Sequence, residues 1–233
     1  MNAPPDKPLN DSTIVFDLDG TLIDTAPDLL RALNQVLDLE GLAHPAEAVV
    51  RGFVGHGARA LIEKAANAAG AHYTGTRLDQ LTAAFIEFYA ADIAALSRPF
   101  PGTVAALDQL AQAGARLAIC TNKRTDLSVQ LIEALGLSAR FASIVGADSV
   151  TARKPDPGHF FEAVSRAGGA GAPAFLIGDT DTDASTAKAA GVPFVLVRFG
   201  YGDADKVART IGADAIIDSF EELPALARTL LTR

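Results

Sequence analysis

The chain has 233 residues and a formal charge of −8; 49% of its residues are hydrophobic and 21% are charged. This is the composition of a globular protein, and the length suits one large domain or a core with a smaller inserted domain. The negative charge disfavours nucleic acids and anionic membrane surfaces as partners, and no apolar run reaches the roughly 20 residues of a membrane-spanning helix.

Side chains for redox chemistry or soft metals are scarce. Cys120 is the single cysteine, so it cannot form a disulfide within the chain, and its apolar surroundings predict a small buried side chain. The four histidines are too far apart for a zinc site. Residues 1–12 lack the apolar stretch of a signal peptide and are expected to form a loose tail. Together these features predict a cytoplasmic protein.

The first predicted element is a strand at residues 13–16, because this β-branched and aromatic run stops at a polar loop, Asp17-Leu-Asp-Gly20. Thr25 is then predicted to cap a helix, with Asp28 returning a hydrogen bond to the cap as in a capping box. Up to residue 98 every periodic segment is helical, most clearly 58–69 and 78–96, and no strand signal interrupts them.

From residue 99 onward, strands and helices alternate. Strands are predicted at 116–120, 143–145, 174–177, 194–197 and 215–217, and helices at 104–113, 126–135, 158–167, 184–190, 203–211 and from 220. Such alternation predicts a parallel sheet with helices on both faces. We therefore expect an α/β, Rossmann-like core formed by residues 13–22 and 99–233, with an all-helical cap domain inserted at residues 23–98.

Ligands of open α/β sheets bind beyond the carboxyl ends of the strands, so the residues there are the candidate site. These ends and the loop before residue 158 supply Asp17, Asp19, Thr121, Asn122, Lys123, Lys154, Asp179 and Asp183. Four aspartates in one crevice would repel one another unless a cation joined them, and an all-oxygen set suits Mg²⁺. Phosphoryl transfer fits such a site, because carboxylates can serve as nucleophile and acid while cations neutralise the phosphoryl oxygens.

Each motif also has an ordinary structural interpretation. An Asp-x-Asp-Gly sequence is commonly a turn, and Asp183 could be a helix N-cap as well as a ligand. Gly55 and Gly57 could simply end one helix and permit the next, with His56 exposed between them. The occurrence of all the motifs at successive strand ends favours the functional interpretation of the set.

In this order and spacing, the motifs at residues 17–21, 121–123, 153–156 and 178–183 resemble those of the haloacid dehalogenase superfamily, in its subgroup of phosphatases with a helical cap inserted after the first motif. The resemblance extends from residue 13 to the end of the chain. Within the subgroup, Gly52-Phe-Val-Gly-His-Gly57, Thr121-Asn-Lys123 and residues 212–223 are similar to phosphoglycolate phosphatases.

The resemblance implies a role for each matched residue. Asp17 would be the nucleophile that forms a phosphoaspartyl intermediate, and Asp19 would protonate the leaving alkoxide and later activate water. Mg²⁺ would be held by the carboxylates of Asp17 and Asp179 and the backbone carbonyl of Asp19, with Asp183 ligating directly or through a water molecule; the part of Asp181 stays open. Thr121 and the N–H of Asn122 would bind the phosphoryl group, and Lys154 would pair with Asp17 and the phosphate.

The implied substrate is a small phosphorylated metabolite, first of all 2-phosphoglycolate. Its carboxylate needs a cation, for which His56 and Arg59 on the cap and Lys123 and Arg124 on the core are candidates. The residues expected to bind substrate are Gly20, Asn122, Lys123, Gly55, His56, Gly57 and Arg59. The cap is expected to close over the site as a lid.

Other functions stay open at this stage. Asp19 argues against a dehalogenase, but a phosphatase of another small sugar phosphate or of pyrophosphate, or a sugar phosphomutase, would share these motifs. A phospho-accepting signalling module also combines Asp, Thr and Lys, yet its fold has no place for a helical insert. A non-catalytic binding module should lack a catalytic carboxylate, and none is missing. Both a monomer and a homodimer are compatible with the sequence.

Overall fold

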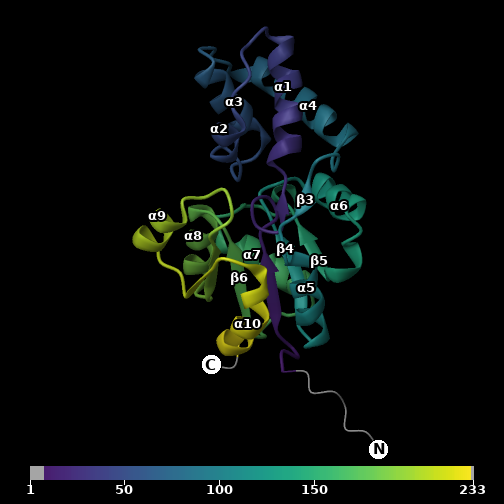
Figure 1. Ribbon diagram of the computed structural model, residues 1–233, viewed down its shortest axis with the longest axis vertical. Coiled ribbons are helices and arrows are strands. Elements are labelled where there is room, and N and C mark those ends of the chain that lie inside the picture. Colours follow the sequence, from purple (N-terminus) through teal and green to yellow (C-terminus); the bar gives the residue numbers. More distant parts are fainter. Residues whose placement is uncertain (1–7, 232–233) are drawn as a thin grey trace, which may run out of the picture.

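The computed structural model describes residues 8–231, and within this range a six-stranded parallel sheet forms the centre of the core (Figure 1). In spatial order the strands are β5 (Ser143–Val145), β4 (Arg116–Cys120), β1 (Thr13–Phe16), β6 (Ala174–Gly178), β7 (Phe194–Val197) and β8 (Ala215–Ile217). β1 pairs in parallel with β4 and β6 and is buried throughout, as expected for an apolar strand covered on both faces. The predicted α/β class is confirmed.

Helices cover both faces of the sheet, because alternate side chains of each strand point in opposite directions. One face packs against α7 (Pro157–Arg166), α8 (Asp181–Ala190) and α9 (Ala204–Thr210). The other packs against α5 (Thr103–Gln112), α6 (Thr125–Ala134) and α10 (Leu223–Leu231), which follows a short 3₁₀ turn at Phe220–Glu222. Val15 and Leu176 belong to the hydrophobic cluster on the face covered by α7, α8 and α9. Their neighbours Ile14 and Phe175 belong to the cluster on the opposite face.

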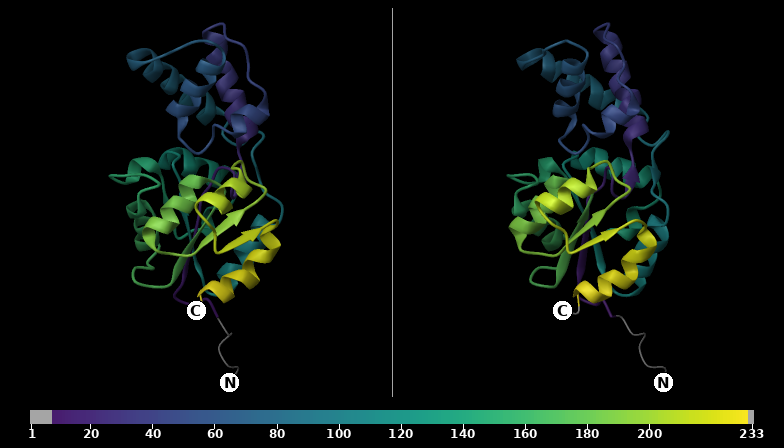
Figure 2. Two further views of the ribbon diagram at one scale, coloured as in Figure 1. Left: turned by 90° about the vertical axis from the view of Figure 1, so that its left-hand side faces the viewer. Right: turned by 60° about the vertical axis from the view of Figure 1, so that its left-hand side comes forward.

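Between β1 and α5 the chain forms a separate helical layer over the carboxyl ends of the strands (Figures 1 and 2). It consists of α1 (Ala26–Leu39), α2 (Glu47–Arg51), α3 (Ala58–Ala68) and α4 (Gly75–Ala91). α4 packs against both α1 and α3 around buried Leu33, Leu61 and Phe85. We call this layer the cap.

Two short strands join the cap to the core. β2 (Ile23–Asp24) and β3 (Arg98–Pro99) pair in antiparallel fashion where the chain leaves and re-enters the core. The expectation that no strand interrupts residues 23–98 is therefore wrong. Two-residue strands carry no period-two pattern, so the sequence offers no signal for them.

The predicted capping box at the start of α1 is also wrong. Thr25 caps the helix without a side-chain hydrogen bond, and Asp28 turns to the segment after α4 instead. Asp28 Oδ2 accepts hydrogen bonds from the backbone N–H groups of Leu96 and Ser97 at 2.9 and 2.7 Å and from the Ser97 hydroxyl at 2.7 Å. These contacts hold residues 96 and 97 outside the helix, so α4 ends before the predicted residue 96.

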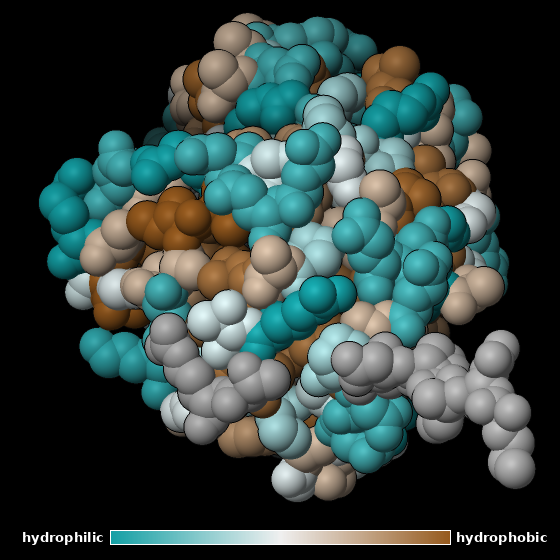
Figure 3. Space-filling model, turned by 60° about the horizontal axis from the view of Figure 1, so that its bottom comes forward, coloured by the Kyte–Doolittle hydropathy of each residue, from teal (hydrophilic) through white to brown (hydrophobic). Residues whose placement is uncertain are grey.

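The rest of the core surface is ordinary. Residues 1–7 of the expected tail lie outside the described residues, and from Pro8 onward the chain contacts the core: Leu9 is buried and its N–H donates to the Ala113 carbonyl at 3.0 Å. Cys120 is a buried free thiol, as predicted. Hydrophilic and hydrophobic side chains are interspersed on the end away from the cap (Figure 3). Among residues 8–231, no helix is both long and apolar enough to cross a membrane.

Candidate active site

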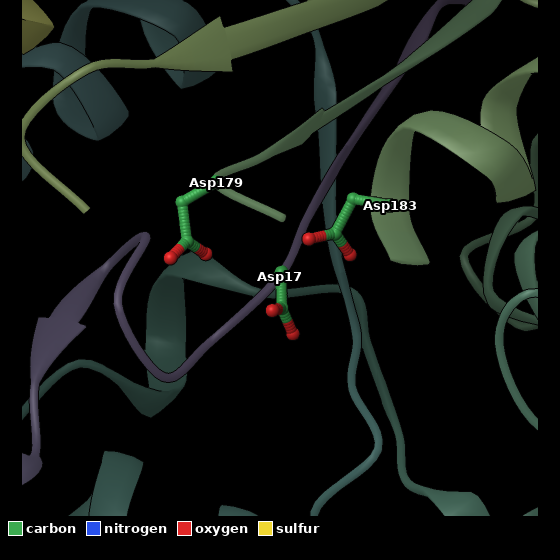
Figure 4. Close-up of side chains that lie close together, drawn as sticks. All are labelled: Asp17, Asp179 and Asp183. Atoms are coloured by element: carbon green, nitrogen blue, oxygen red, sulfur yellow. The ribbon is translucent and has the colours of Figure 1, made fainter. Parts of the chain in front are cut away.

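Three aspartates converge at the carboxyl edge of the sheet, beneath the cap. Asp17 follows β1, Asp179 follows β6, and Asp183 lies in the first turn of α8. One carboxylate oxygen from each lies within 4.8 Å of the others, and Figure 4 shows the three carboxylates close together. They meet because parallel pairing puts Phe16 beside Ile177, so the two strands end at the same level. All three side chains are buried.

A buried lysine lies against this cluster. Lys154 Nζ is 2.9 Å from Asp17 Oδ1 and 2.6 Å from Asp183 Oδ1, and the side chain is 1% exposed. Burial alone would lower the pKa of Lys154, but the charges of Asp17 and Asp183 outweigh it and raise that pKa, so the lysine is a cation. The sequence predicted its pairing with Asp17; the contact with Asp183 is new.

The cluster carries more negative charge than the lysine neutralises. Burial raises the pKa of Asp17 to about 7 despite the nearby Lys154, with repulsion from Asp183 and Asp179 acting in the same direction. Burial and the charge of Asp183 likewise raise the pKa of Asp179 to about 6. When all are ionised, the three carboxylates and one ammonium described in this cluster leave a net charge of −2, which one divalent cation would neutralise.

The residues around Asp179 fix its orientation. Asp179 Oδ1 accepts a hydrogen bond from the Thr21 hydroxyl at 2.9 Å, and Oδ2 accepts from the N–H groups of Tyr201 and Gly202 at 2.8 and 3.3 Å. Gly20 lies in the left-handed region at φ 84°, and a Cβ there would stand 2.6 Å from Asp179 Oδ2. Gly20, predicted to bind substrate, is required here by the close approach of the Asp179 carboxylate.

Asp183 contributes to the fold as well as to the cluster. The N-cap of α8 is Thr180, and its N–H and hydroxyl both donate to Asp183 Oδ2, at 3.1 and 2.6 Å. The interpretation of Asp183 as an N-cap is therefore wrong by three residues, since Asp183 occupies the third position of a capping box. Its other oxygen is the one that contacts Lys154.

Asp19 points away from the three-aspartate cluster toward Lys123. Lys123 Nζ lies 3.1 Å from Asp19 Oδ1 and 3.3 Å from Oδ2, and 4.3 Å from the centre of the Tyr89 ring on α4. Burial would lower the pKa of Lys123, but Asp19 outweighs it and raises that pKa. Lys123 thus holds the predicted acid–base residue, a contact that the sequence did not indicate.

The segment after β4 connects the core with the cap. Thr121 is buried and accepts a hydrogen bond from the Lys123 N–H at 3.2 Å. The Asn122 amide donates to the carbonyls of Lys154 at 3.2 Å and Gly55 at 3.3 Å. The side chain of Asn122 therefore joins the phosphate-binding candidate, the buried lysine and the cap loop at residues 55–57.

A cavity of about 350 Å³ lies between these residues and the cap. Its core side includes Asp17, Asp19 and Thr121, and its cap side is largely apolar, with contributions from Leu29, Val54, Leu61, Phe85, Ile86 and Tyr89. The volume is that of a small-molecule site, and most of its polar lining residues belong to the core side.

The predicted substrate-binding residues divide between two hollows. The cavity over Asp17 is lined by most of them: Gly55, Gly57, Arg59, Asn122, Lys123 and Arg124. Arg59 is exposed there and pairs with Asp79 at 3.1 Å. His56 and Asp181 instead line a second hollow, behind the cap loop, together with Tyr201. The structure thus brings most of the set together but places His56 apart from it.

Some residues that support the site were not predicted. Thr21 and Tyr201 orient Asp179, while Tyr89 and Arg153 line the cavity. Tyr201 lies beyond the end of β7, so applying the strand-end rule to that strand as well would have found it. Tyr89 carries no such signal, because its position on α4 resembles any other core position of an amphipathic helix.

The parallel core, the inserted helical layer and the aspartate cluster with its buried lysine define a phosphoryl-transfer enzyme with an α/β core. A profile of haloacid dehalogenase-like hydrolases matches residues 14–197. The chain belongs to this family.

Alignments with phosphoglycolate phosphatases of other organisms extend over nearly the whole chain. A phosphoglycolate phosphatase of Caulobacter vibrioides is 49% identical over 224 residues, which are 96% of this chain and 94% of that protein. One of Mesorhizobium japonicum is 48% identical over 210 residues, 90% of this chain and 92% of that protein. The crystal structure of a predicted phosphoglycolate phosphatase from Haemophilus somnus superimposes with a TM-score of 0.83 at 27% identity, covering 92% of this chain and 97% of that one.

Proposed function

We propose that this protein hydrolyses 2-phosphoglycolate to glycolate and phosphate. The observation that carries the proposal is the 49% identity, over almost the full length, to a phosphoglycolate phosphatase. The site supports it independently, since a carboxylate nucleophile and a second carboxylate lie on the core side of a cavity suited to a small molecule.

In the proposed first step, a carboxylate oxygen of Asp17 attacks phosphorus. A P–O bond to Asp17 forms, the ester P–O bond breaks, and Asp19 gives its proton to the leaving alkoxide of glycolate. Lys154, 2.9 Å from Asp17, neutralises charge on the phosphoryl oxygens, and Thr121 and the N–H of Asn122 donate hydrogen bonds to them. Asp19 then takes a proton from water, whose oxygen attacks phosphorus and releases Asp17.

The chain's residues fit a bound Mg²⁺. Asp17, Asp179 and Asp183 offer carboxylate oxygens within 4.8 Å of one another, no Cys or His takes part, and the excess negative charge calls for a divalent cation. Asp17 and Asp179 would hold the ion together with the Asp19 carbonyl, with Asp183 ligating or orienting a bound water. When bound, Mg²⁺ supplies positive charge to the phosphoryl group. We place this activity in the cytoplasm, acting on a free metabolite.

The test is phosphate release from a panel of small phosphate esters that includes 2-phosphoglycolate, sugar phosphates and pyrophosphate. Each is assayed with Mg²⁺ and with chelator, for the wild type and for Asp17→Asn, which removes the nucleophile's charge with little change in size. We expect the highest kcat/KM for 2-phosphoglycolate, and no turnover in chelator or with the variant.

Each other outcome overturns part of the proposal. A higher kcat/KM for another ester would move the function to that substrate. Isomerisation of a sugar phosphate without hydrolysis would make the protein a mutase. Turnover by Asp17→Asn close to that of the wild type would remove Asp17 as the nucleophile. A circular dichroism spectrum of the variant that matches the wild type shows that the fold is retained.

A further inference from the structure

The cavity over Asp17 contains a cation that the catalytic arrangement does not use. Arg153 lies in the loop just before the buried Lys154, and it lines the cavity together with Thr121 and Asn122. Among residues 8–231, no carboxylate lies within ion-pair distance of its guanidinium, and no hydrogen bond from this side chain is formed. In the sequence it belongs to the motif at residues 153–156, in which a role was expected only of Lys154.

The other cations of the cavity are already engaged. Arg59 pairs with Asp79 at 3.1 Å, Lys123 with Asp19 at 3.1 Å, and Arg124 with Asp126 at 2.7 Å. Lys154 is held between Asp17 and Asp183. Of the positively charged side chains described around this cavity, Arg153 alone can take a new anionic partner without breaking an ion pair.

Arg153 also lies at the boundary between core and cap. A Cβ placed on Gly57 would stand 3.2 Å from Arg153 Nη1 and 3.8 Å from the Asn122 carbonyl oxygen. The guanidinium therefore lies directly beneath the cap loop and beside the segment proposed to bind the phosphoryl group. Gly57, at φ 89°, leaves room for it there.

We propose that Arg153 binds the carboxylate of the substrate and so determines selectivity for an acid phosphate; this rests on the proposed function. A small phosphate ester with a carboxylate carries a second anion a few bonds from phosphorus, and the cation that the cap contributes to the cavity, Arg59, is already paired with Asp79. A guanidinium can bind a carboxylate through two parallel hydrogen bonds, a geometry that an ammonium cannot match. Arg153 supplies that fork from the core, leaving the cap to exclude water.

The test compares 2-phosphoglycolate with ethyl phosphate, an ester of the same carbon number without the carboxylate. For Arg153→Ala we expect kcat/KM for 2-phosphoglycolate to fall about 10- to 100-fold, the effect of losing hydrogen bonds to a charged group. For ethyl phosphate we expect a change of less than about threefold. Arg153→Lys, which keeps the charge but not the fork, should lie between the wild type and Arg153→Ala on 2-phosphoglycolate.

Arg166→Ala is the matched control, since Arg166 is an exposed arginine of α7 that pairs with Glu162 outside the cavity. It removes the same charge and should leave the ratio of the two kcat/KM values unchanged. If Arg153→Ala lowers both esters equally, or neither, the inference is wrong. If the wild type itself does not prefer 2-phosphoglycolate to ethyl phosphate, the proposed function fails instead, so the two failures are distinguishable.

Discussion

The two halves of the cavity differ in how firmly their charged groups are held. On the core side, Asp17, Asp179, Asp183 and Lys154 are buried, and Lys154 bridges two carboxylates: Lys154 is 1% exposed and Asp183 is 0% exposed. On the cap side the wall is mostly apolar, and the Arg59–Asp79 ion pair is 52% and 64% exposed. The chemistry is thus preorganised in the rigid half, while the half that covers the substrate contributes shape and excludes water.

The contrast is expected from the folding of each half. Core groups lie at the ends of strands that are hydrogen-bonded on both sides, so their positions follow from the sheet register. The cap is tied to the core through two short linkers and few direct contacts such as Asn122 to Gly55. A group that must hold a reacting atom therefore belongs on the core, and a group that must move to admit substrate belongs on the cap.

The largest effect on stability and activity is expected when the cation of the core half is removed with Lys154→Met. Three buried carboxylates then lose their ammonium, and breaking a buried pair in this way costs about 3–5 kcal/mol of unfolding free energy. Activity should fall at least about 100-fold, because a group that stabilises the transition state is lost. Activity assays and urea unfolding in chelator measure the two effects.

The effect of Mg²⁺ on the melting temperature of Lys154→Met tests whether the ion binds beside Lys154. Because Lys154→Met leaves the carboxylates more negative, adding Mg²⁺ should raise the melting temperature of the variant by more than that of the wild type. Lys188→Met, on the exposed surface of α8, is the matched control and should behave like the wild type. Equal Mg²⁺ effects in all three proteins would mean that the ion does not bind beside Lys154.

The next largest effect concerns pH, through His159 behind the core half. His159 is buried; its Nδ1 accepts from the Lys154 N–H at 3.2 Å and its Nε2 donates to the Val145 carbonyl at 3.0 Å. Burial, followed by the charge of Lys154, lowers the pKa of His159 to about 4. The folded protein therefore keeps this imidazole neutral at a pH where the unfolded chain binds a proton.

The sign follows from the two pKa values. Between pH 6.5 and about 4 the unfolded chain holds the extra proton on this imidazole, so His159 by itself lowers the free energy of unfolding by about 3 kcal/mol as pH falls through this window. The raised pKa values of Asp17 and Asp179 act in the opposite direction, because there the folded protein holds the extra protons. In urea unfolding from pH 7 to 4, the free energy of unfolding should therefore fall more steeply, or rise less steeply, with decreasing pH in the wild type than in His159→Gln, and the difference between the two slopes measures His159. Parallel slopes for both proteins would mean that His159 does not titrate in this range.

A smaller effect is expected at the link between the halves. The Tyr201 hydroxyl donates to Asp24 Oδ1 at 2.6 Å and accepts from the N–H groups of Thr25 and Ala26 at 2.7 and 2.9 Å, while its own N–H holds Asp179. Tyr201→Phe leaves these linker groups without their partner, which costs about 1–3 kcal/mol of stability. Since the linker carries the cap, kcat and KM should change together, by about three- to tenfold.

Tyr73→Phe removes the same hydroxyl from the cap, where it contacts Glu40, and is the control for Tyr201→Phe. It should leave kcat and KM at their wild-type values. If Tyr201→Phe lowers stability but not turnover, the hydroxyl is a structural contact only, and the cap moves independently of Asp179.

The same contrast explains what the sequence could predict. The strands at 13–16, 116–120, 143–145, 194–197 and 215–217 were predicted with their observed bounds, because apolar runs in a parallel sheet are distinctive. The predicted catalytic residues follow those strands, so their convergence followed from the topology. Asp28 and Thr25 were misassigned because local propensity favoured a capping box, whereas the Leu96 and Ser97 N–H groups, distant in sequence, bind Asp28 instead.

Residues that act through distant contacts escaped prediction for the same reason. Unlike Arg59 and Arg124, Arg153 has no acidic partner among the residues described. The sequence does not show this difference, because an ion pair across 20 residues, such as that between Arg59 and Asp79, leaves no local pattern. The hydrogen bonds from Tyr201 to the linker span more than 170 residues. Selectivity and coupling therefore had to be inferred from the structure.

The smallest expected effect is on the cap half, with Arg59→Ala. An exposed ion pair contributes about 0–1 kcal/mol, so the free energy of unfolding should change by less than that. Because Arg59 is held by Asp79, the kcat/KM preference for 2-phosphoglycolate over ethyl phosphate should stay within about threefold of the wild-type value. Asp79→Ala is the complementary variant, since it frees Arg59 to face the cavity. If Arg59→Ala reduces the preference tenfold and Asp79→Ala increases it, the cap rather than Arg153 binds the carboxylate, and the division between a charged core half and an apolar cap half does not hold.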